Sequence, residues 1–160
     1  MDWLTNLAKA ATAIGSEEFC WITPSGDTIR LREYEAVSID VPTSHLGKVR
    51  IPVGDGGIDH NAMRKALPPS FIHSYDAALL KLAFQDWTKP IAVIHDCLKV
   101  LPTDMDEALE RVRRAFCKVC DGNPLQDIQD TLQVHTDTLE PIEQGDGELN
   151  KVLGSVYLFN

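Results

Sequence analysis

Residues 90–102 read PIAVIHDCLKVLP, in which His95 and Asp96 interrupt a run of apolar residues. Two short apolar segments with a polar break between them are typical of a β-hairpin, so we predict strands over residues 91–95 and 97–101 with Asp96 at the bend. A buried carboxylate at such a bend costs free energy unless it is paired or holds a metal. From spacing alone, Asp96 also fits an ordinary turn residue that hydrogen-bonds its own backbone. Asp96 is therefore the residue that a functional interpretation must explain.

Several stretches surround this hairpin in a fixed order. They are MDWLTNLAKAA (1–11), WITPSGDTIRLREY (21–34), PPSFIHSYD (68–76), IHDC (94–97) and GELNKVLGSVYLFN (147–160). The ordered set resembles the carboxyl-terminal palm region of single-subunit, phage-type DNA-dependent RNA polymerases, a family of phage and mitochondrial enzymes. The resemblance covers nearly the whole chain, whereas an isolated His-Asp pair carries almost no information.

The resemblance implies an α+β fold, with a polymerase palm-like antiparallel β-hairpin floor and helices packed on it. We expect one domain over residues 1–160, a length sufficient for a hydrophobic core. Within it we expect a promoter-hairpin-like β region at 18–53, palm motifs at 68–120 and an acidic carboxyl-terminal region at 121–160.

The resemblance also assigns functions to single residues. Asp96 is expected to bind the Mg²⁺ ions that activate the RNA 3′-hydroxyl and stabilise the leaving pyrophosphate. His73 is expected near the nucleotide, where it can sense a 2′-hydroxyl, with His95 and Asn160 also close to the nucleotide or primer. The alternatives from the residues alone are a packed structural His95 and a His73 that is incidental to a helix start.

Arg50 is the candidate DNA-binding residue. It lies in LGKVRIPV (46–53), where the related enzymes carry their promoter-reading hairpin, and an arginine there can reach a guanine edge or a phosphate. Asp40, Pro42 and Pro52 occupy positions where base-reading enzymes tend to carry polar or basic side chains. The alternative for Arg50 is therefore a solvated charge on a strand.

The charge and hydropathy of the chain limit the classes of protein to which it can belong. Apolar residues make up 44% of the chain, which excludes a disordered segment, and no apolar stretch is long enough to span a membrane. The net charge is −9, the wrong sign for a free-standing nucleic-acid binder. Residues 121–160 hold eight acidic residues and one lysine, which leaves residues 1–120 with a net charge of −2. We see no signal peptide, and expect the cytoplasm of a phage-infected bacterium or an organelle matrix.

In the amino-terminal half, apolar spacing predicts a helix over residues 2–14 and strands over 19–23 and 28–34. A second, weaker strand pair is expected at 37–41 and 46–53, followed by a flexible break at Gly54 to Gly57.

Further along, Asp59 can cap a short helix to Ala66 that Pro68 and Pro69 end. Ser70 or Ser74 then caps a helix through Trp87. A capping box of Asp104 with Glu107 begins a helix to Cys120, and a further helix is expected over 124–134 and a last helical turn within 148–155.

The four cysteines are Cys20, Cys97, Cys117 and Cys120. Their irregular spacing does not form a disulfide framework, so we expect buried structural thiols. Zinc binding by Cys117 and Cys120 is the alternative, and it lacks a second cysteine pair.

Two parts of the polymerase machinery have no match here. The resemblance requires a second metal-binding aspartate and a fingers helix with a lysine and a tyrosine for the triphosphate, and residues 1–70 supply neither. We therefore expect a carboxyl-terminal portion or split subunit of a DNA-directed RNA polymerase, a nucleotidyltransferase that is inactive as an isolated chain. Its partners are the fingers and amino-terminal regions, the DNA template, nascent RNA and nucleoside triphosphates, with no membrane.

Two other functions stay open. One is a non-catalytic remnant that binds a polymerase or DNA. The other is a metal-dependent nuclease on a palm-like floor, for which Asp76 is the only local second carboxylate.

Overall fold

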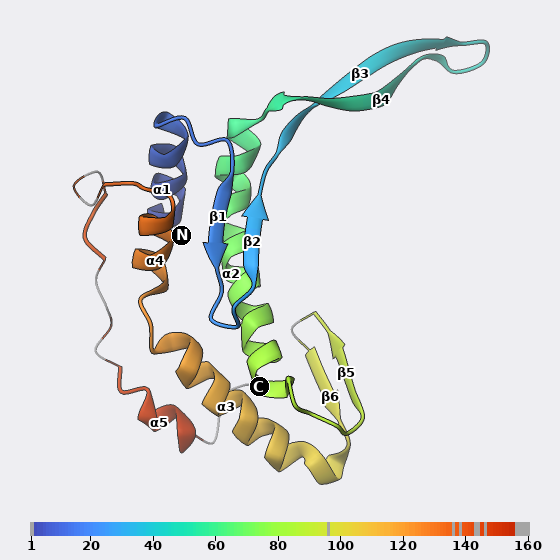
Figure 1. The fold of residues 1–160 in the computed structure, drawn as a ribbon. Coiled ribbons are helices and arrows are strands. Elements are labelled where there is room, and N and C mark those ends of the chain that lie inside the picture. Colours follow the sequence, from blue (N-terminus) through green and yellow to red (C-terminus); the bar gives the residue numbers. More distant parts are fainter. Residues whose placement is uncertain are drawn as a thin grey trace.

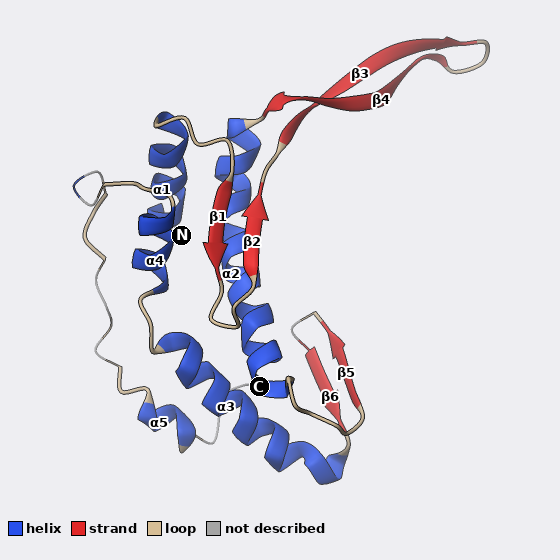
Figure 2. Ribbon diagram, viewed as in Figure 1, coloured by secondary structure: helices blue, strands red, loops and turns tan. Residues whose placement is uncertain are grey.

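The computed structural model describes residues 2–95, 97–135, 137, 139–142, 145 and 147–155. Its elements in order are α1 (Asp2–Ala13), β1 (Phe19–Ile22), β2 (Thr28–Leu31), β3 (Tyr34–Thr43), β4 (Gly47–Ile58), α2 (His60–Phe84), β5 (Ile91–Ile94), β6 (Cys97–Val100), a 3₁₀ turn (Pro102–Asp104), α3 (Met105–Cys120), α4 (Pro124–Thr131) and α5 (Asn150–Leu153). Helices and antiparallel hairpins together make a mixed α+β architecture, as we expected (Figure 2).

The main core lies where α1, the β1–β2 hairpin, the first half of α2 and α4 meet (Figure 1). Its most deeply buried large side chains are Leu7, Phe19, Trp21, Met63, Leu67 and Ile128. The predicted helix at the amino terminus is confirmed as α1, which buries one apolar face. The indole N–H of Trp3 on this helix donates a hydrogen bond to the Glu140 carbonyl, 3.1 Å away and 137 residues along the chain. Segments far apart in the sequence therefore contribute to one packed unit.

Helix α2 runs without interruption from His60 to Phe84, so the predicted break at Pro68 and Pro69 is wrong. Each proline removes one backbone hydrogen bond from a helix interior. Pro68 is buried beside Leu67, and the burial of this apolar surface offsets part of that loss. The predicted cap at the start is confirmed, because the Asp59 carboxylate accepts hydrogen bonds from the first-turn amides of Asn61 and Ala62.

Ser70 and Ser74 lie inside α2, so neither caps a helix as we predicted. Ser74 instead bonds to its own helix, where its hydroxyl donates to the Phe71 carbonyl at 2.7 Å. The same hydroxyl accepts the indole N–H of Trp21 at 2.9 Å. This contact ties β1 to the middle of α2 in the core.

The strands form three separate two-stranded antiparallel sheets. The second predicted pair is confirmed but is much longer than expected, since β3 and β4 form one extended hairpin that projects from the helical body (Figure 1). Gly54 to Gly57 belong to β4 and are not a break. A side chain at Gly56 would meet the Glu35 carbonyl at 3.0 Å, which explains glycine at that position in the hairpin.

The predicted helices at 104–120 and 124–134 are confirmed as α3 and α4, and α5 matches the expected last turn. Asp104 occupies the N-cap position of α3, yet its side chain makes no capping hydrogen bond. The cysteines are free thiols, as expected, but Cys97 and Cys120 are exposed, so the prediction that they are buried is wrong. Nothing in the described part of the chain has the length and apolar character of a membrane-spanning helix.

Candidate functional site

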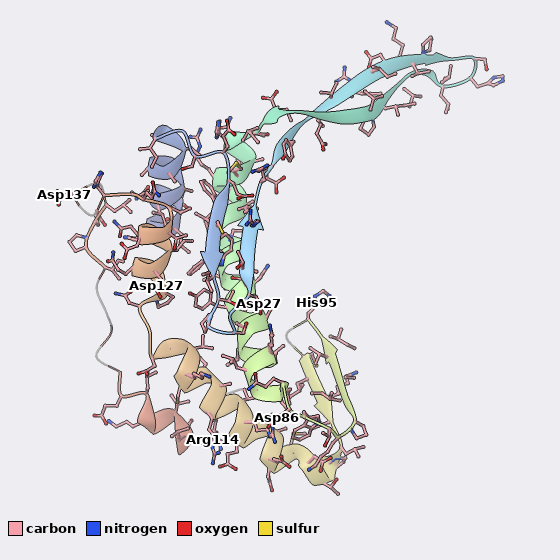
Figure 3. The ribbon with its side chains drawn as sticks, in the orientation of Figure 1. Asp27, Asp86, His95, Arg114, Asp127 and Asp137 are labelled. Carbon is pink, nitrogen blue, oxygen red and sulfur yellow. The ribbon has the colours of Figure 1, made fainter. Side chains whose placement is uncertain are left out.

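The β5–β6 hairpin ends in a two-residue bend, because Ile94 pairs with Cys97. His95, the first residue of the bend, has a φ of 54°, a left-handed conformation typical of the tight turns that join antiparallel strands. Asp96 is the second residue of this bend and lies outside the described residues. The predicted hairpin is therefore confirmed, with His95 at its exposed tip (Figure 3).

The apolar residues of this hairpin are not enclosed by the described part of the chain. All four residues of β5 are exposed, and the exposed fractions of Val93 and Ile94 are 49% and 54%. Only Leu98 of β6 packs against the smaller core cluster, which contains Ala83 of α2 and Val112 of α3. The hairpin is thus attached to α2 and α3 mainly through one apolar side chain, and its β5 strand is exposed.

His73 lies in the middle of α2 with its side chain exposed. Asp76 follows three residues later on the same exposed face of the helix. The structure records no hydrogen bond between His73 and His95. Asp76, the carboxylate of the nuclease alternative, lies on the same face of α2 as His73.

Arg50 lies on β4 and faces Asp40 on β3, its register partner. The guanidinium Nε donates a hydrogen bond to an Asp40 oxygen at 3.0 Å, and 73% of the arginine side chain stays exposed. Ile39 and Ile51 form the neighbouring cross-strand pair. Because side chains alternate along a strand, the charged pair occupies one face of the hairpin and the isoleucines the other.

No group of three or more His, Cys, Asp or Glu side chains that could hold a metal ion gathers among the described residues. Magnesium binds oxygen ligands and keeps several waters, so a single carboxylate does not make a two-metal site. Asp96 is the one magnesium ligand that we expect in this chain, and its binding of the metal stays a prediction. Asp96 and Asn160, both predicted to lie near the reaction, fall outside the described residues.

Sequence reasoning missed a charged network at the base of the β5–β6 hairpin. We call it the Trp87 clamp, and its members are Asp86, Trp87, Lys89, Asp104, Glu107 and Arg111. The ammonium of Lys89 donates hydrogen bonds to Asp104 at 2.9 Å and to Glu107 at 2.7 Å. These hydrogen bonds raise the pKa of Lys89, and the Lys89 ammonium lowers the pKa of Glu107.

Arg111 completes the clamp from α3. Its Nε donates to Glu107 at 3.1 Å and its terminal nitrogen to Asp86 at 2.6 Å. Asp86 lies just beyond the end of α2, away from the hairpin tip marked by His95 (Figure 3). Only the pairing of Glu107 with Arg111, four residues apart on one helix, had a signal in the sequence.

A cavity of about 510 Å³ lies between the end of β1, α2 and α4. Trp21, Tyr75, Lys118 and Asp127 are among its lining residues, and none of the predicted site residues that the structure describes is. Burial, with a smaller effect from the Asp127 carboxylate, raises the pKa of Tyr75 to about 12. The cavity is thus a separate feature from the hairpin tip.

Comparison with known proteins identifies similar chains. The family model described as DNA-dependent RNA polymerase matches residues 1–152. DNA-directed RNA polymerase 1A of Nicotiana tabacum is 30% identical over 146 residues, which cover 88% of this chain and 94% of that relative. The mitochondrial DNA-directed RNA polymerase 1 of Nicotiana sylvestris is 26% identical over 166 residues, covering all of this chain and 16% of the relative.

A phage protein is similar over the same extent. The DNA-directed RNA polymerase of Enterobacteria phage K11 is 22% identical over 187 residues, covering 99% of this chain and 21% of the relative. The chain thus spans about a sixth of the length of several curated relatives that it matches.

Proposed function

Because this chain belongs to the phage-type, single-subunit family of DNA-dependent RNA polymerases, we propose that it contributes the hairpin carrying one metal-binding aspartate of the polymerase active site. The residue is Asp96, and the hairpin belongs to the palm. The observation that carries the proposal is the two-residue bend between Ile94 and Cys97, with its left-handed first residue. Such a bend projects a short side chain from a rigid backbone, as a metal ligand requires.

The proposed reaction is template-directed nucleotidyl transfer. The 3′-hydroxyl of the RNA attacks the α-phosphate of a nucleoside triphosphate, and pyrophosphate leaves. A bound divalent cation, magnesium in this proposal, stabilises negative charge on the attacking and leaving oxygens. In this reaction, the proposed role of the chain is to hold the Asp96 carboxylate at the bend.

The rest of the site must come from other sequence. The fingers and amino-terminal regions of the polymerase are proposed to supply a second carboxylate and the residues that bind the triphosphate. Residues 1–160 do not match those regions. Those regions, the DNA template, nascent RNA and the triphosphates are the proposed partners. The names of the relatives favour an organelle or a phage-infected cell as the compartment.

Four further residues have proposed functions. His73, exposed on α2, is proposed to sense the ribose 2′-hydroxyl. His95 and Asn160 are proposed to lie near the nucleotide or primer end. Arg50 is proposed to contact DNA through the exposed part of its guanidinium, although its pairing with Asp40 competes with that contact.

The test uses the active polymerase that contains these residues, as one polypeptide or as an assembly. Asp96→Ala should abolish RNA synthesis while the thermal unfolding midpoint stays close to wild type, because metal-ion stabilisation of the reaction is worth several kcal/mol and about 1.4 kcal/mol is tenfold in rate. Asp76→Ala is the matched control and should retain synthesis. An Asp96→Ala enzyme that keeps more than about a tenth of wild-type elongation would exclude Asp96 from this function.

A non-catalytic polymerase- or DNA-binding remnant remains the second candidate. It is compatible with the finding that no cluster of three or more His, Cys, Asp or Glu side chains gathers among the described residues. Template-dependent nucleotide incorporation separates the two candidates. A non-catalytic remnant should not support incorporation, even when a partner polypeptide is added. The purified chain alone should be inactive under either candidate. Incorporation by the chain alone that Asp96→Ala removes would instead place the whole site within these residues.

A further inference from the structure

The β5–β6 hairpin has little apolar attachment to the rest of the molecule. Every residue of β5 is exposed, and Leu98 is the hairpin residue that packs against the smaller core cluster. A two-stranded hairpin is only marginally stable by itself. Contacts at its base must therefore contribute to its orientation on the α2–α3 body.

The Trp87 clamp provides such contacts. Lys89 lies just before β5 and Asp104 lies just after β6, so their ion pair at 2.9 Å closes the two ends of the hairpin against each other. The Lys89 ammonium also binds Glu107 of α3 at 2.7 Å. One lysine thus joins both ends of the hairpin to a helix of the body.

An aromatic ring also contacts the same lysine. The Lys89 ammonium lies 5.1 Å from the centre of the Trp87 ring, and the Arg111 guanidinium lies 5.2 Å from it. Both distances allow cation–π attraction. Phe84, the last residue of α2, meets the Trp87 ring edge-on at 5.4 Å between centroids. Lys89 is therefore oriented by Trp87, just beyond the end of α2, and by Glu107 of α3.

The side chain of Asp104 binds Lys89 and does not cap helix α3. Asp104 occupies the N-cap position of α3, where an aspartate usually accepts amide hydrogen bonds from the first turn. Here its carboxylate bonds to Lys89 instead and is only 12% exposed. Glu107, the other half of the predicted capping box, is likewise bonded to Lys89.

We propose that Lys89 is a positioning residue, whose ion pairs with Asp104 and Glu107 set the orientation of the β5–β6 hairpin and hence the aim of the bend that carries Asp96. The inference rests on the proposed function of Asp96. Lys89 lies at the opposite end of the hairpin from the bend and acts only through it. The Lys89 and Glu107 side chains are 41% and 43% exposed, and an ion pair with that exposure contributes little to stability, so this part of the clamp can be opened without unfolding the molecule. Orientation is more sensitive, since a misplacement of about 1 Å can cost about a hundredfold in rate.

The experiment compares three lysine variants of the active polymerase. Lys89→Met keeps an unbranched side chain over Trp87 but loses both ion pairs, Lys89→Arg keeps the charge, and Lys99→Met is the matched control. Lys99 is an exposed residue of β6 that forms no ion pair with a described residue. The measurements are the Mg²⁺ concentration for half-maximal elongation, the maximal rate and the thermal unfolding midpoint.

The expected result is specific to the clamp. Lys89→Met should raise the half-maximal Mg²⁺ concentration roughly tenfold, because a ligand whose support is lost binds its metal less well. Its unfolding midpoint should fall somewhat below that of Lys99→Met, because the largely buried Asp104 carboxylate loses its partner, while α2 and α3 stay folded. Lys89→Arg should restore most of the wild-type Mg²⁺ dependence. Amide hydrogen exchange in residues 91–100 should accelerate in Lys89→Met while α2 and α3 remain protected. Glu107→Gln should reproduce the shift in Mg²⁺ dependence and provides a second variant if Lys89→Met does not fold.

Other outcomes overturn the inference. A Mg²⁺ dependence of Lys89→Met equal to that of Lys99→Met, with Asp96→Ala inactive, would refute the positioning role and leave the proposed function intact. A lowered unfolding midpoint with unchanged Mg²⁺ dependence would make the clamp purely structural. If Asp96→Ala is active, the proposed function fails first, and the inference fails with it.

Discussion

The Arg50 guanidinium donates a hydrogen bond to Asp40 across the β3–β4 hairpin, at 3.0 Å between Nε and the carboxylate oxygen. The pair is exposed, so it contributes little to stability. The pair matters for electrostatics, because the Asp40 carboxylate partly neutralises Arg50, the residue that is proposed to bind DNA. The affinity of this hairpin for DNA should therefore depend on both residues.

The first prediction follows from that pair. Asp40→Asn should strengthen DNA binding by the polymerase, because it removes a negative charge that repels phosphate and frees Arg50. Arg50→Gln should weaken binding and lower the slope of log affinity against log salt by about one. Fluorescence anisotropy at several salt concentrations measures both. Equal salt slopes for Arg50→Gln and wild type would show that Arg50 is a solvated strand charge.

The second prediction concerns ribose discrimination. His73→Ala should raise the use of deoxyribonucleotides relative to ribonucleotides more than it slows elongation, because one hydrogen bond to the 2′-hydroxyl is lost. Such a bond is worth about 1 kcal/mol, which corresponds to roughly a fivefold change in discrimination. Competition between paired ribo- and deoxyribonucleotides measures it, with Asp76→Ala on the same helix face as the control. A variant with unchanged discrimination would leave His73 without the proposed function.

The third prediction concerns the tie between β1 and α2. Ser74→Ala should lower the free energy of unfolding by about 1–3 kcal/mol, because the Trp21 indole N–H loses its acceptor in a largely buried position. Chemical denaturation followed by tryptophan fluorescence measures the change. Ser70→Ala, in the same helix but without that bond, should be much milder. Equal losses in the two variants would mean that the Trp21 hydrogen bond is not the cause.

The fourth prediction is a pH dependence at the cavity. The pKa of Tyr75 is about 12 in the folded protein, against about 10 for a free tyrosine. The folded state therefore favours the neutral phenol, and this contribution to stability is complete below pH ~10 and is lost as pH rises toward ~12. Phenolate absorbance should show a late-titrating component that Tyr75→Phe removes. If the absorbance titration is unchanged in Tyr75→Phe, the raised pKa belongs to another tyrosine.

Much of the fold could be predicted from local signals. The helix at the amino terminus, the β1–β2 hairpin, α3 and α4 each carry their own apolar period and their own start or stop residues. The site hairpin was also predictable, because its two apolar segments are separated by a polar pair. These elements depend mainly on residues close to one another in the sequence.

Two of the failures share a physical cause, which is that tertiary contacts overrode a local rule. Pro68 normally ends a helix, but its burial in the core keeps α2 continuous. Asp104 and Glu107 form a local capping signal, but both carboxylates accept hydrogen bonds from Lys89, which lies 15 and 18 residues away. Nothing near Lys89 in the sequence indicates that contact, so the clamp could be recognised only in the structure.

The hydrogen bond between Trp3 and Glu140 joins residues 137 positions apart. During synthesis, α1 leaves the ribosome well before α4 and the segment around Glu140 exist. The apolar face of α1 therefore has only part of its cover until α4 is made, since Ile128 of α4 belongs to the same core cluster as Leu7. A nascent chain that stalls before α4 keeps that surface open to other chains, so aggregation competes with folding until the last quarter of this sequence is made.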